Sequence, residues 1–296
     1  MIYTLTLNPA VDYYITTDKF AIGSVNRTTS EQISFGGKGI NVSLVLKQFN
    51  IDSVALGFTG GFTGEALEKQ LTQQGVGCDF VKVEGNTRIN IKLNDTDINA
   101  AGPDISQDEL ERLYKKLENL CDDDFLILSG SVPKSLPQNI YSTIIERLKN
   151  NRINFVVDTE KDLLLETLKY KPFLIKPNHH ELGEIFGAEI KCFNDALLYA
   201  QRLWQKGAQN VMVTLGEQGA VLIDKNGTTY TQIAPSGEPI SAVGAGDSAV
   251  AAFLARHLNG GDSADCLKWA VAAGSATAFS KQLALSDKIK NIYKGL

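Results

Sequence analysis

Short apolar runs alternate with amphipathic stretches along most of this chain. The apolar runs predict buried strands, at Ile2–Leu7, Ser53–Phe58, Phe125–Ser129, Phe155–Asp158, Phe173–Ile175 and Val211–Leu215. The stretches between them carry apolar residues at helical spacing, at Ile40–Phe49, Gly64–Gln74, Gln107–Leu120, Pro137–Asn150, Glu181–Phe186 and Ala196–Lys206. Buried strands that alternate with helices are typical of a parallel sheet with helices on both faces. The pattern therefore predicts an α/β fold.

The last part of the chain departs from this alternation. Two β-like runs, Ala220–Ile223 and Thr228–Ile233, flank the turn Lys225-Asn226-Gly227, which predicts a hairpin. Two alanine-rich helices, at about 247–258 and 264–281, follow. We expect the chain to end in a short basic tail.

Two polar segments, 12–34 and 88–100, also break the strand–helix rhythm. They alternate apolar and polar residues without a helical period, and they predict a small β-sheet that projects from the core as a lid. Its apolar residues need cover, from the cleft, a second copy of the chain, or both. These residues include Ile15, Phe20, Ile22, Ile89, Ile91 and Leu93.

Composition narrows the class of protein. The chain has 296 residues, 43% hydrophobic and 21% charged, with a net charge of −5, which favours neither nucleic-acid nor membrane binding. The four cysteines, at 78, 121, 192 and 266, lack CxxC spacing and are expected to be reduced thiols. The N-terminus predicts a strand rather than a signal peptide, so we expect a cytoplasmic protein. The acidic run 122–124 is expected to be a solvated turn.

The stretch Gly244-Ala245-Gly246-Asp247-Ser248 carries the first candidate chemistry. A glycine turn that enters a helix directs backbone amides and the positive end of the helix dipole at one point, which suits an oxyanion. A carboxylate at Asp247 would accept a proton from an attacking hydroxyl beside a transferring phosphate. It would equally serve as a helix cap, and this stretch alone leaves both interpretations open. We expect the helix start to lower the pKa of Asp247.

A second glycine turn, Gly36-Gly37-Lys38-Gly39, enters the predicted helix that contains Asn41. Lys38 supplies a cation at this helix start, and Asn41 offers a donor and an acceptor for a hydroxyl. The spacing is not that of a P-loop, and the alternative is a tight turn with a solvated lysine. Loops of this kind gather at the carboxyl edge of a parallel sheet. Two anion sites there would suit a phosphorylated acceptor and a nucleotide donor.

Two further stretches could hold the nucleotide. Asn178 and Glu181 have capping-box spacing, and Glu181 could also hold a magnesium-bound water. The glycine turn after Thr214, with Gly216 and Gly219, is a candidate phosphate loop.

Together these motifs resemble the pfkB (ribokinase-like) carbohydrate kinases over essentially the whole chain. The N-terminal signature is 36–43 with Gly60 further on, and the C-terminal signature is 244–247. The resemblance implies one ribokinase-like kinase domain over 1–296, a three-layer α/β/α fold with a mostly parallel central sheet and a small β-sheet lid. The strings 6–12 and 87–88 look like the branch of 1-phosphofructokinases and tagatose-6-phosphate kinases, and 87–93, 96–99 and 102–103 look most like the former.

The resemblance also implies roles for individual residues. Asp247 would be the general base, with Gly244 and the amides of Ala245, Gly246 and Asp247 around the transferring phosphoryl group. The acceptor would lie among Asp12, Gly37, Lys38, Asn41, Arg88, Asn90, Ser129 and Gly130, with Lys38 and Arg88 on its existing phosphate. Apart from the resemblance, we expect that pairing of the lid with a second copy would place Arg27 near the partner's cleft, as a further ligand of the acceptor's phosphate. ATP would lie among Lys176, Asn178, Thr214, Gly216, Gly219, Gly244 and Gly246, with Mg²⁺ held indirectly by Glu181.

Two positions depart from the family's pattern. Asn50 stands where glycine or serine is usual, and we expect it to be a left-handed helix cap. Ser241 and Ala242 precede the catalytic turn where many members have Asp and Thr or Ser, so a side-chain contact from 242 is lost.

We therefore expect an ATP- and Mg²⁺-dependent kinase that converts D-fructose 1-phosphate to fructose 1,6-bisphosphate, with a possible homodimer through the lid. The alternatives are a tagatose-6-phosphate kinase, a 6-phosphofructokinase, or a catalytically silent sugar-phosphate sensor. Intact Asp247 and Lys38 count against the sensor. A dinucleotide-binding enzyme is disfavoured because no GxGxxG follows the first strand.

Overall fold

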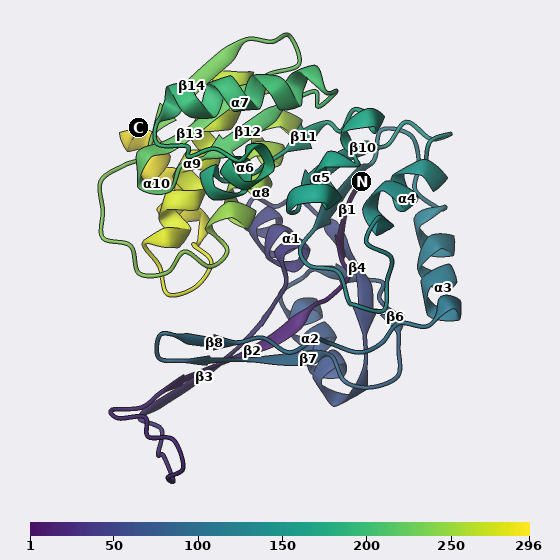
Figure 1. The fold of residues 1–296 in the computed structure, drawn as a ribbon, viewed down its shortest axis with the longest axis vertical. Coiled ribbons are helices and arrows are strands. Elements are labelled where there is room, and N and C mark those ends of the chain that lie inside the picture. Colours follow the sequence, from purple (N-terminus) through teal and green to yellow (C-terminus); the bar gives the residue numbers. More distant parts are fainter.

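A large, mostly parallel sheet forms the centre of the molecule, and helices cover both of its faces (Figure 1). The structure, a computed structural model, describes residues 1–296. The strand order in this sheet is β14-β13-β12-β11-β10-β9-β1-β4-β5, and β6 pairs with the end of β4. Only the pairs β12–β13 and β13–β14 are antiparallel, so β13 alone runs opposite to the other strands. The predicted α/β architecture is confirmed.

The elements have the following bounds. The strands of the large sheet are β1 (Ile2–Thr6), β4 (Ser53–Thr59), β5 (Gly77–Cys78), β6 (Val81–Lys82), β9 (Phe125–Ser129), β10 (Asn154–Asp158), β11 (Leu174–Ile175), β12 (Val211–Thr214), β13 (Gly219–Ile223) and β14 (Thr229–Ile233). The helices are α1 (Lys38–Gln48), α2 (Gly61–Gln73), α3 (Gln107–Leu117), α4 (Ile140–Arg147), α5 (Lys161–Leu165), α6 (His179–Phe186), α7 (Phe193–Gln205), α8 (Ala245–Leu258), α9 (Ser263–Ala278) and α10 (Ser286–Gly295), with short 3-10 turns at Leu168–Tyr170 and Gly216–Gln218. No helix is both long and apolar enough to cross a bilayer.

The large sheet has an apolar core on each of its faces, and alternate residues of each central strand pack into one core or the other. In β9, Leu126 and Leu128 pack with α3, α4 and α7, whereas Phe125 and Ile127 pack on the other side with α1, α8 and α9. Because both faces of the strand are buried, the sequence reads as a continuous apolar run. Burial on both faces thus explains why these strands could be predicted from sequence.

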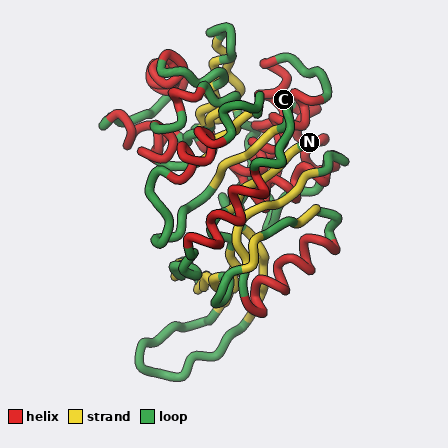
Figure 2. The backbone as a smooth tube through the Cα atoms, turned by 90° about the vertical axis from the view of Figure 1, so that its right-hand side faces the viewer, coloured by secondary structure: helices red, strands yellow, loops and turns green.

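A second sheet projects from this body, with the order β3-β2-β7-β8 (Figure 1). Its strands are β2 (Ala10–Thr16), β3 (Ser30–Gly36), β7 (Arg88–Leu93) and β8 (Thr96–Ile98). The loop between β2 and β3 extends beyond the sheet, at the bottom of Figure 2. The small sheet expected from segments 12–34 and 88–100 is confirmed.

The faces of this small sheet differ from expectation. Asp12 lies opposite both Asn90 and Ser34 across the ladder, so these polar side chains share one face. The apolar residues Ile15, Ile89, Ile91 and Leu93 lie on the other face, together with Ile33 and Ile98. Phe20 and Ile22 lie in the exposed loop, outside the sheet. The expectation that the apolar face closes over the cleft is therefore wrong, because the face that carries Asp12 is polar.

Three local predictions are confirmed and one is wrong. Asn50 follows α1 with φ of 59°, and β13 and β14 form the predicted hairpin, with Gly227 at φ of 79°. Asn178 and Glu181 form the predicted capping box. The expected basic tail is instead the helix α10, whose Ile289 is fully buried against α9.

Candidate active site

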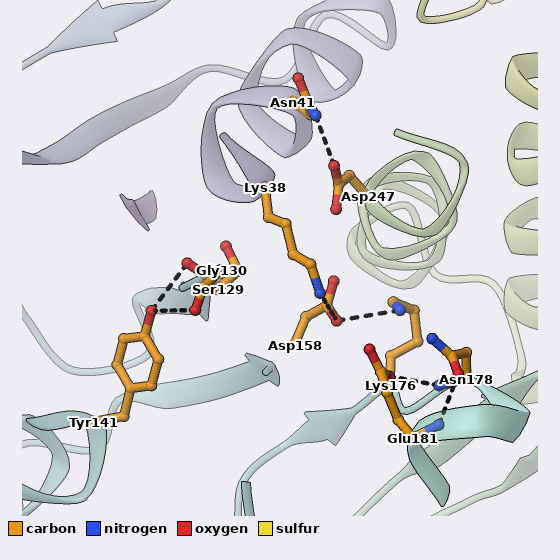
Figure 3. A network of polar contacts seen from close by, with 10 residues as sticks. All are labelled: Lys38, Asn41, Ser129, Gly130, Tyr141, Asp158, Lys176, Asn178, Glu181 and Asp247. Carbon is orange, nitrogen blue, oxygen red and sulfur yellow. Dashed lines mark hydrogen bonds and ion pairs between the residues drawn. The ribbon is translucent and has the colours of Figure 1, made fainter. Parts of the chain in front are cut away.

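The carboxyl ends of β1, β9, β10 and β11 meet at one edge of the large sheet, and α1 and α8 both begin there (Figure 3). This edge gathers polar side chains from widely separated parts of the sequence. In Figure 3, Asn41 contacts Asp247, and beside this pair Lys38 and Lys176 both contact Asp158.

Asp247 lies in the first turn of α8 and is only 5% exposed. The Asn41 amide donates a 2.7 Å hydrogen bond from Nδ2 to Asp247 Oδ2. Burial, and then the negative charge of Asp158, raise the pKa of Asp247 to about 6. The expectation of a lowered pKa is wrong, because loss of solvation in this buried turn outweighs Asn41, the nearby lysines and the helix start. A raised pKa makes this carboxylate a better proton acceptor near neutral pH.

The turn before Asp247 requires glycine. Gly244 caps α8 with φ of 77°, and a Cβ there would lie 2.5 Å from Leu283 Cδ2. The Ala245 amide donates to the Ala242 carbonyl at 3.2 Å, whereas the amides of Gly246 and Asp247 bind no acceptor in the chain. The structure thus leaves two of the three expected amides free for an oxyanion.

The residues before this turn have a structural role of their own. Ser241 accepts a hydrogen bond from the Val243 amide at its Oγ, 3.2 Å away. Its hydroxyl therefore shapes the loop that leads into Gly244.

Two lysines converge on Asp158. Lys38 Nζ and Lys176 Nζ each lie 3.2 Å from Asp158 Oδ1, and the Asp158 side chain is 1% exposed. Burial would lower the pKa of Lys38, but Asp158, then Asp247 and Glu181, outweigh it and raise that pKa. Burial alone would raise the pKa of Asp158, and the two lysines hold it below its usual range. Lys38 and Asp158 are therefore charged at neutral pH.

Asp158 was not among the residues expected from sequence. It closes the apolar run that predicts β10, as Ser129 closes β9, and a polar residue at the carboxyl end of a buried parallel strand is the signal that could have found it. The Lys38 amine lies at Asp158, not beside Arg88, so its expected contact with the acceptor's phosphate stays a prediction.

A group of polar side chains that suits hydroxyl groups lies where the small sheet meets the body. Asn90 Nδ2 donates to Asp12 Oδ1 at 2.8 Å, and Asn90 Oδ1 accepts from the Ala100 amide. A Cβ on Gly36 would lie 3.5 Å from Asp12 Oδ2 and 3.7 Å from Asn41 Oδ1. Glycine at 36 therefore leaves space between the two oxygens, and both can accept from a sugar.

Arg88 is mostly buried beside this group of side chains, and burial lowers its pKa, with Asp12 opposing. Its guanidinium donates to the Asn8 carbonyl at 2.9 Å, to the Ala100 carbonyl at 3.2 Å and to Ser131 Oγ at 3.4 Å. Arg88 Nε has no partner. These contacts fix the guanidinium beside Ser131 and leave part of its hydrogen-bonding capacity for an anion.

Ser129 lies differently from expectation. Its side chain has no exposed area, and its Oγ would lie 3.2 Å from a Cβ on Gly39, so it is covered by the first turn of α1. The Tyr141 hydroxyl contacts the Ser129 and Gly130 carbonyls at 3.0 and 3.1 Å. Ser129 thus supports the turn at Gly130, and the hydroxyl beside Arg88 belongs to Ser131.

The expected nucleotide residues lie on the other side of the network. Asn178 Oδ1 accepts from the Glu181 amide at 2.9 Å, Glu181 Oε2 accepts from the Asn178 amide at 2.8 Å, and Asn178 pairs with Thr214. Gly216 has φ of 58° and open space at its Cβ position. Gly219 is needed for another reason, because its Cβ would lie 2.0 Å from the Gln232 carbonyl of β14.

The remaining expected residues are Gly37 and Arg27. Gly37 caps α1 with φ of 141°, and a Cβ there would lie 2.6 Å from Thr6 Cγ2. Arg27 is exposed in the β2–β3 loop, outside the network around Asp247.

The acidic side chains at the site suit a metal ion that is bound mainly through the phosphates of a substrate. No group of three His, Cys, Asp or Glu side chains could hold an ion by itself. Glu181 uses one carboxylate oxygen in its capping box and keeps the other. Mg²⁺ usually keeps several waters and is bound through few carboxylates plus substrate phosphates, which suits this donor set.

Comparison with known proteins gives consistent matches. Residues 5–290 match the pfkB family of carbohydrate kinases. The 1-phosphofructokinase of Bacillus subtilis (strain 168) is 41% identical over 295 residues, covering 99% of this chain and 97% of the relative. The D-tagatose-1-phosphate kinase of Bacillus licheniformis is 37% identical, covering 98% of this chain and 96% of the relative. Phosphofructokinase-2 from Escherichia coli, solved with substrates and products, superposes with a TM-score of 0.93 at 28% identity, covering 100% and 99% of the two chains. The structural match confirms the ribokinase-like fold class.

Proposed function

The chain belongs to the pfkB family of carbohydrate kinases, and we propose that it transfers the γ-phosphoryl group of ATP to D-fructose 1-phosphate. The protein is a phosphotransferase that acts on a sugar hydroxyl, with ATP as co-substrate. The products of the proposed reaction are D-fructose 1,6-bisphosphate and ADP. The network around Asp247 is the observation that carries the mechanism, and the name of the Bacillus subtilis relative supports the acceptor.

Asp247 acts as the general base in this proposal. The acceptor's 6-hydroxyl oxygen attacks the γ-phosphorus, its proton passes to Asp247, and the bond between the γ-phosphorus and the bridging oxygen of ADP breaks. The pKa of about 6 leaves the carboxylate ionised at neutral pH, and Asn41 holds it in place. The free amides of Gly246 and Asp247 and the amines of Lys38 and Lys176 stabilise the negative charge of the transferring group.

The acceptor lies between the small sheet and the body. Asp12, Asn41 and Asn90 bind sugar hydroxyls, and the guanidinium of Arg88 with Ser131 binds the phosphate already present. A fixed guanidinium suits a phosphate because its donors match two phosphate oxygens. Gly130, directly before Ser131, has no side chain that could block the turn there.

The nucleotide lies along Lys176, Asn178, Thr214 and Gly216, with its terminal phosphate at Gly244 and Gly246. Mg²⁺ bound to these phosphates would neutralise part of their charge, with Glu181 on one of its waters. Gly219 shapes this loop through its contact with β14.

The small sheet acts as a lid in this proposal, within one kinase domain over 1–296. Its polar face carries Asp12 and Asn90, so closure over the acceptor would exclude water from the reaction. Its apolar face lies on the opposite side, where a second copy of the chain could cover it and bring Arg27 of the lid loop toward the partner's cleft. We place the activity in the cytoplasm, where ATP is available.

A panel of acceptors tests the choice of substrate. Release of ADP is measured with D-fructose 1-phosphate, D-fructose 6-phosphate, D-tagatose 1-phosphate, D-tagatose 6-phosphate, free D-fructose and D-ribose. We expect the highest kcat/KM for fructose 1-phosphate and poor use of both free sugars. A preference for a tagatose phosphate would move the assignment to that branch, which the Bacillus licheniformis relative supports. Equal use of free fructose and fructose 1-phosphate would contradict the phosphate site at Arg88.

A further inference from the structure

One buried carboxylate joins the two sides of the active-site cleft. Lys38, in the first turn of α1, lies on the acceptor side, and Lys176, after β11, leads to the nucleotide residues. Both amines lie 3.2 Å from the same oxygen, Asp158 Oδ1 (Figure 3). Asp158 therefore links the two halves of the site through its side chain.

The contacts of Asp158 are unusual for a carboxylate with a purely structural role. Its Oδ2 atom is buried without a hydrogen-bond partner, and the two lysines are its only side-chain partners. A structural aspartate such as Asp124 instead uses both oxygens, accepting from the N-terminal amine of Met1 and from the Cys121 amide. The Asp158 carboxylate therefore lies where it pairs with the two lysines and with no other side chain.

The lysines need this carboxylate to remain where they are. Because both amines lie within hydrogen-bond distance of one oxygen, they are close enough to repel each other strongly in a buried site. A Cβ on Gly246 would lie 3.1 Å from Lys176 Nζ, which places this amine at the start of α8, beside Asp247. Loss of the charge at Asp158 would let both amines move away from the point where the phosphoryl group passes.

We propose that Asp158 is a positioning residue, which holds the amines of Lys38 and Lys176 together beside Asp247 and so sets the charge at the point of phosphoryl transfer. This inference rests on the proposed kinase mechanism and adds to it a residue that touches neither substrate. Its effect on the reaction passes through the lysines and through Asp247.

Asp158 also acts on the proposed base. Burial is the largest cause of the raised pKa of Asp247, and the charge of Asp158 is the next. Asn41 of α1, Lys38 of α1 and Lys176 after β11 oppose both. Removal of the charge at Asp158 should therefore change the pKa of Asp247, directly through the lost charge and indirectly through the two lysines that it no longer holds.

The variant Asp158→Asn tests the proposal, since it keeps the shape of the side chain and removes its charge. With ATP and fructose 1-phosphate, we expect kcat to fall about 100-fold, because small displacements of catalytic groups have effects of that size. We also expect the acid limb of the kcat/KM profile to move, because the pKa of Asp247 depends on the charge of Asp158 and on the positions of the two lysines. A purely structural role for Asp158 would reduce the melting temperature and the active fraction without moving that limb.

Asp124→Asn is the matched control, because Asp124 is 7% exposed and lies before β9, at the opposite edge of the sheet. We expect it to keep the wild-type pH profile even where it lowers the melting temperature. An unmoved acid limb in Asp158→Asn would overturn the proposal. Recovery of its kcat at raised Mg²⁺ would also overturn it, because that result identifies a metal ligand.

A second set of variants leaves Asp158 in place, in case Asp158→Asn does not fold. Lys38→Met, Lys176→Met and the double variant form a cycle, and we expect the effect of the double variant on kcat to differ at least about fivefold from the product of the single effects. Independent effects would contradict a shared carboxylate. A wild-type protein inactive on fructose 1-phosphate but active on another acceptor of the panel would refute only the proposed substrate, and the same variants are then assayed with that acceptor.

Discussion

At the scale of single residues, burial determines the chemistry of Asp247. A carboxylate in the first turn of a helix is expected to be acidic, yet only 5% of this residue is exposed and Asp158 adds a second negative charge. Asn41 partly compensates by donating to the ionised form. The pH dependence of the reaction should report the balance of these effects.

We predict an acid limb in the kcat/KM profile with a midpoint near pH 6, since the base must be ionised and its pKa is about 6. Activity is retained above this pH and lost as the pH falls through it. Asn41→Ala removes the hydrogen bond that lowers the pKa of Asp247, so its limb should move to higher pH. Steady-state rates at constant ionic strength measure both midpoints. A wild-type limb near the ordinary pKa of aspartate, about 4, would refute the raised pKa.

Arg88 gives a prediction for substrate affinity. Arg88→Ala should raise KM for fructose 1-phosphate by about 10- to 100-fold, the worth of hydrogen bonds between charged groups. KM for ATP should change less than about twofold, because Arg88 contacts only the acceptor side, at Asn8, Ala100 and Ser131. Arg88→Lys keeps the positive charge but lacks the paired N–H donors of a guanidinium, so it should give an intermediate KM. An equal rise in both KM values would indicate a general loss of structure.

Sequence could identify some of these residues and not others. The glycine turns at Gly37 and Gly244 have conformations that L side chains rarely adopt, so their pattern marks the two helix starts. The pairing of Asp158 with two lysines depends on the order of strands in the sheet. The spacing of residues along the chain does not reveal this order. Ser129 and Ser131 differ by two residues, and only burial shows which hydroxyl is accessible.

At the scale of elements, the small sheet turns its polar face toward the site, whereas we expected its apolar face there. Alternation along β2 and β7 predicted the strands, but a strand with one polar and one apolar face does not show from its sequence which face meets the body. The register shows that Asp12 and Asn90 share the face at the site. The helix α10 was missed because lysines surround the apolar positions Ile289, Ile292 and Tyr293, which pack on α9.

The apolar face of the small sheet leads to a prediction about assembly. Ile98 is 54% exposed on that face, and a glutamate there should prevent a second copy from covering it. We expect light scattering at micromolar concentration to give a dimer for the wild type and a monomer for Ile98→Glu. Leu198→Glu is the matched control, since Leu198 is 56% exposed on α7. A wild-type monomer would contradict the dimer.

Hydrogen exchange tests the lid separately. Fructose 1-phosphate should slow exchange across 12–34 and 88–100, because closure protects the small sheet. Unchanged exchange in both segments would contradict a closing lid.

At the scale of the whole molecule, the topology assembles the site. Strands β1, β9, β10 and β11 are neighbours in the sheet, and their parallel direction brings residues from Asp12 to Asp247 to one edge. The buried core supports this edge, and in the proposed mechanism the small sheet supplies the part that moves. In this mechanism, the cleft transfers a phosphoryl group to a sugar phosphate, with Asp247 as the base.

Phosphorus NMR of the reaction products tests this claim most directly. Wild-type protein with ATP, Mg²⁺ and D-fructose 1-phosphate should give the two phosphate resonances of D-fructose 1,6-bisphosphate as ADP appears. Asp247→Asn should fold and bind ATP, but it should form this product at least about 1000-fold more slowly, since both proton acceptance and alignment are lost. Absence of the bisphosphate with the wild type, or more than a tenth of the wild-type rate with Asp247→Asn, would contradict the mechanism.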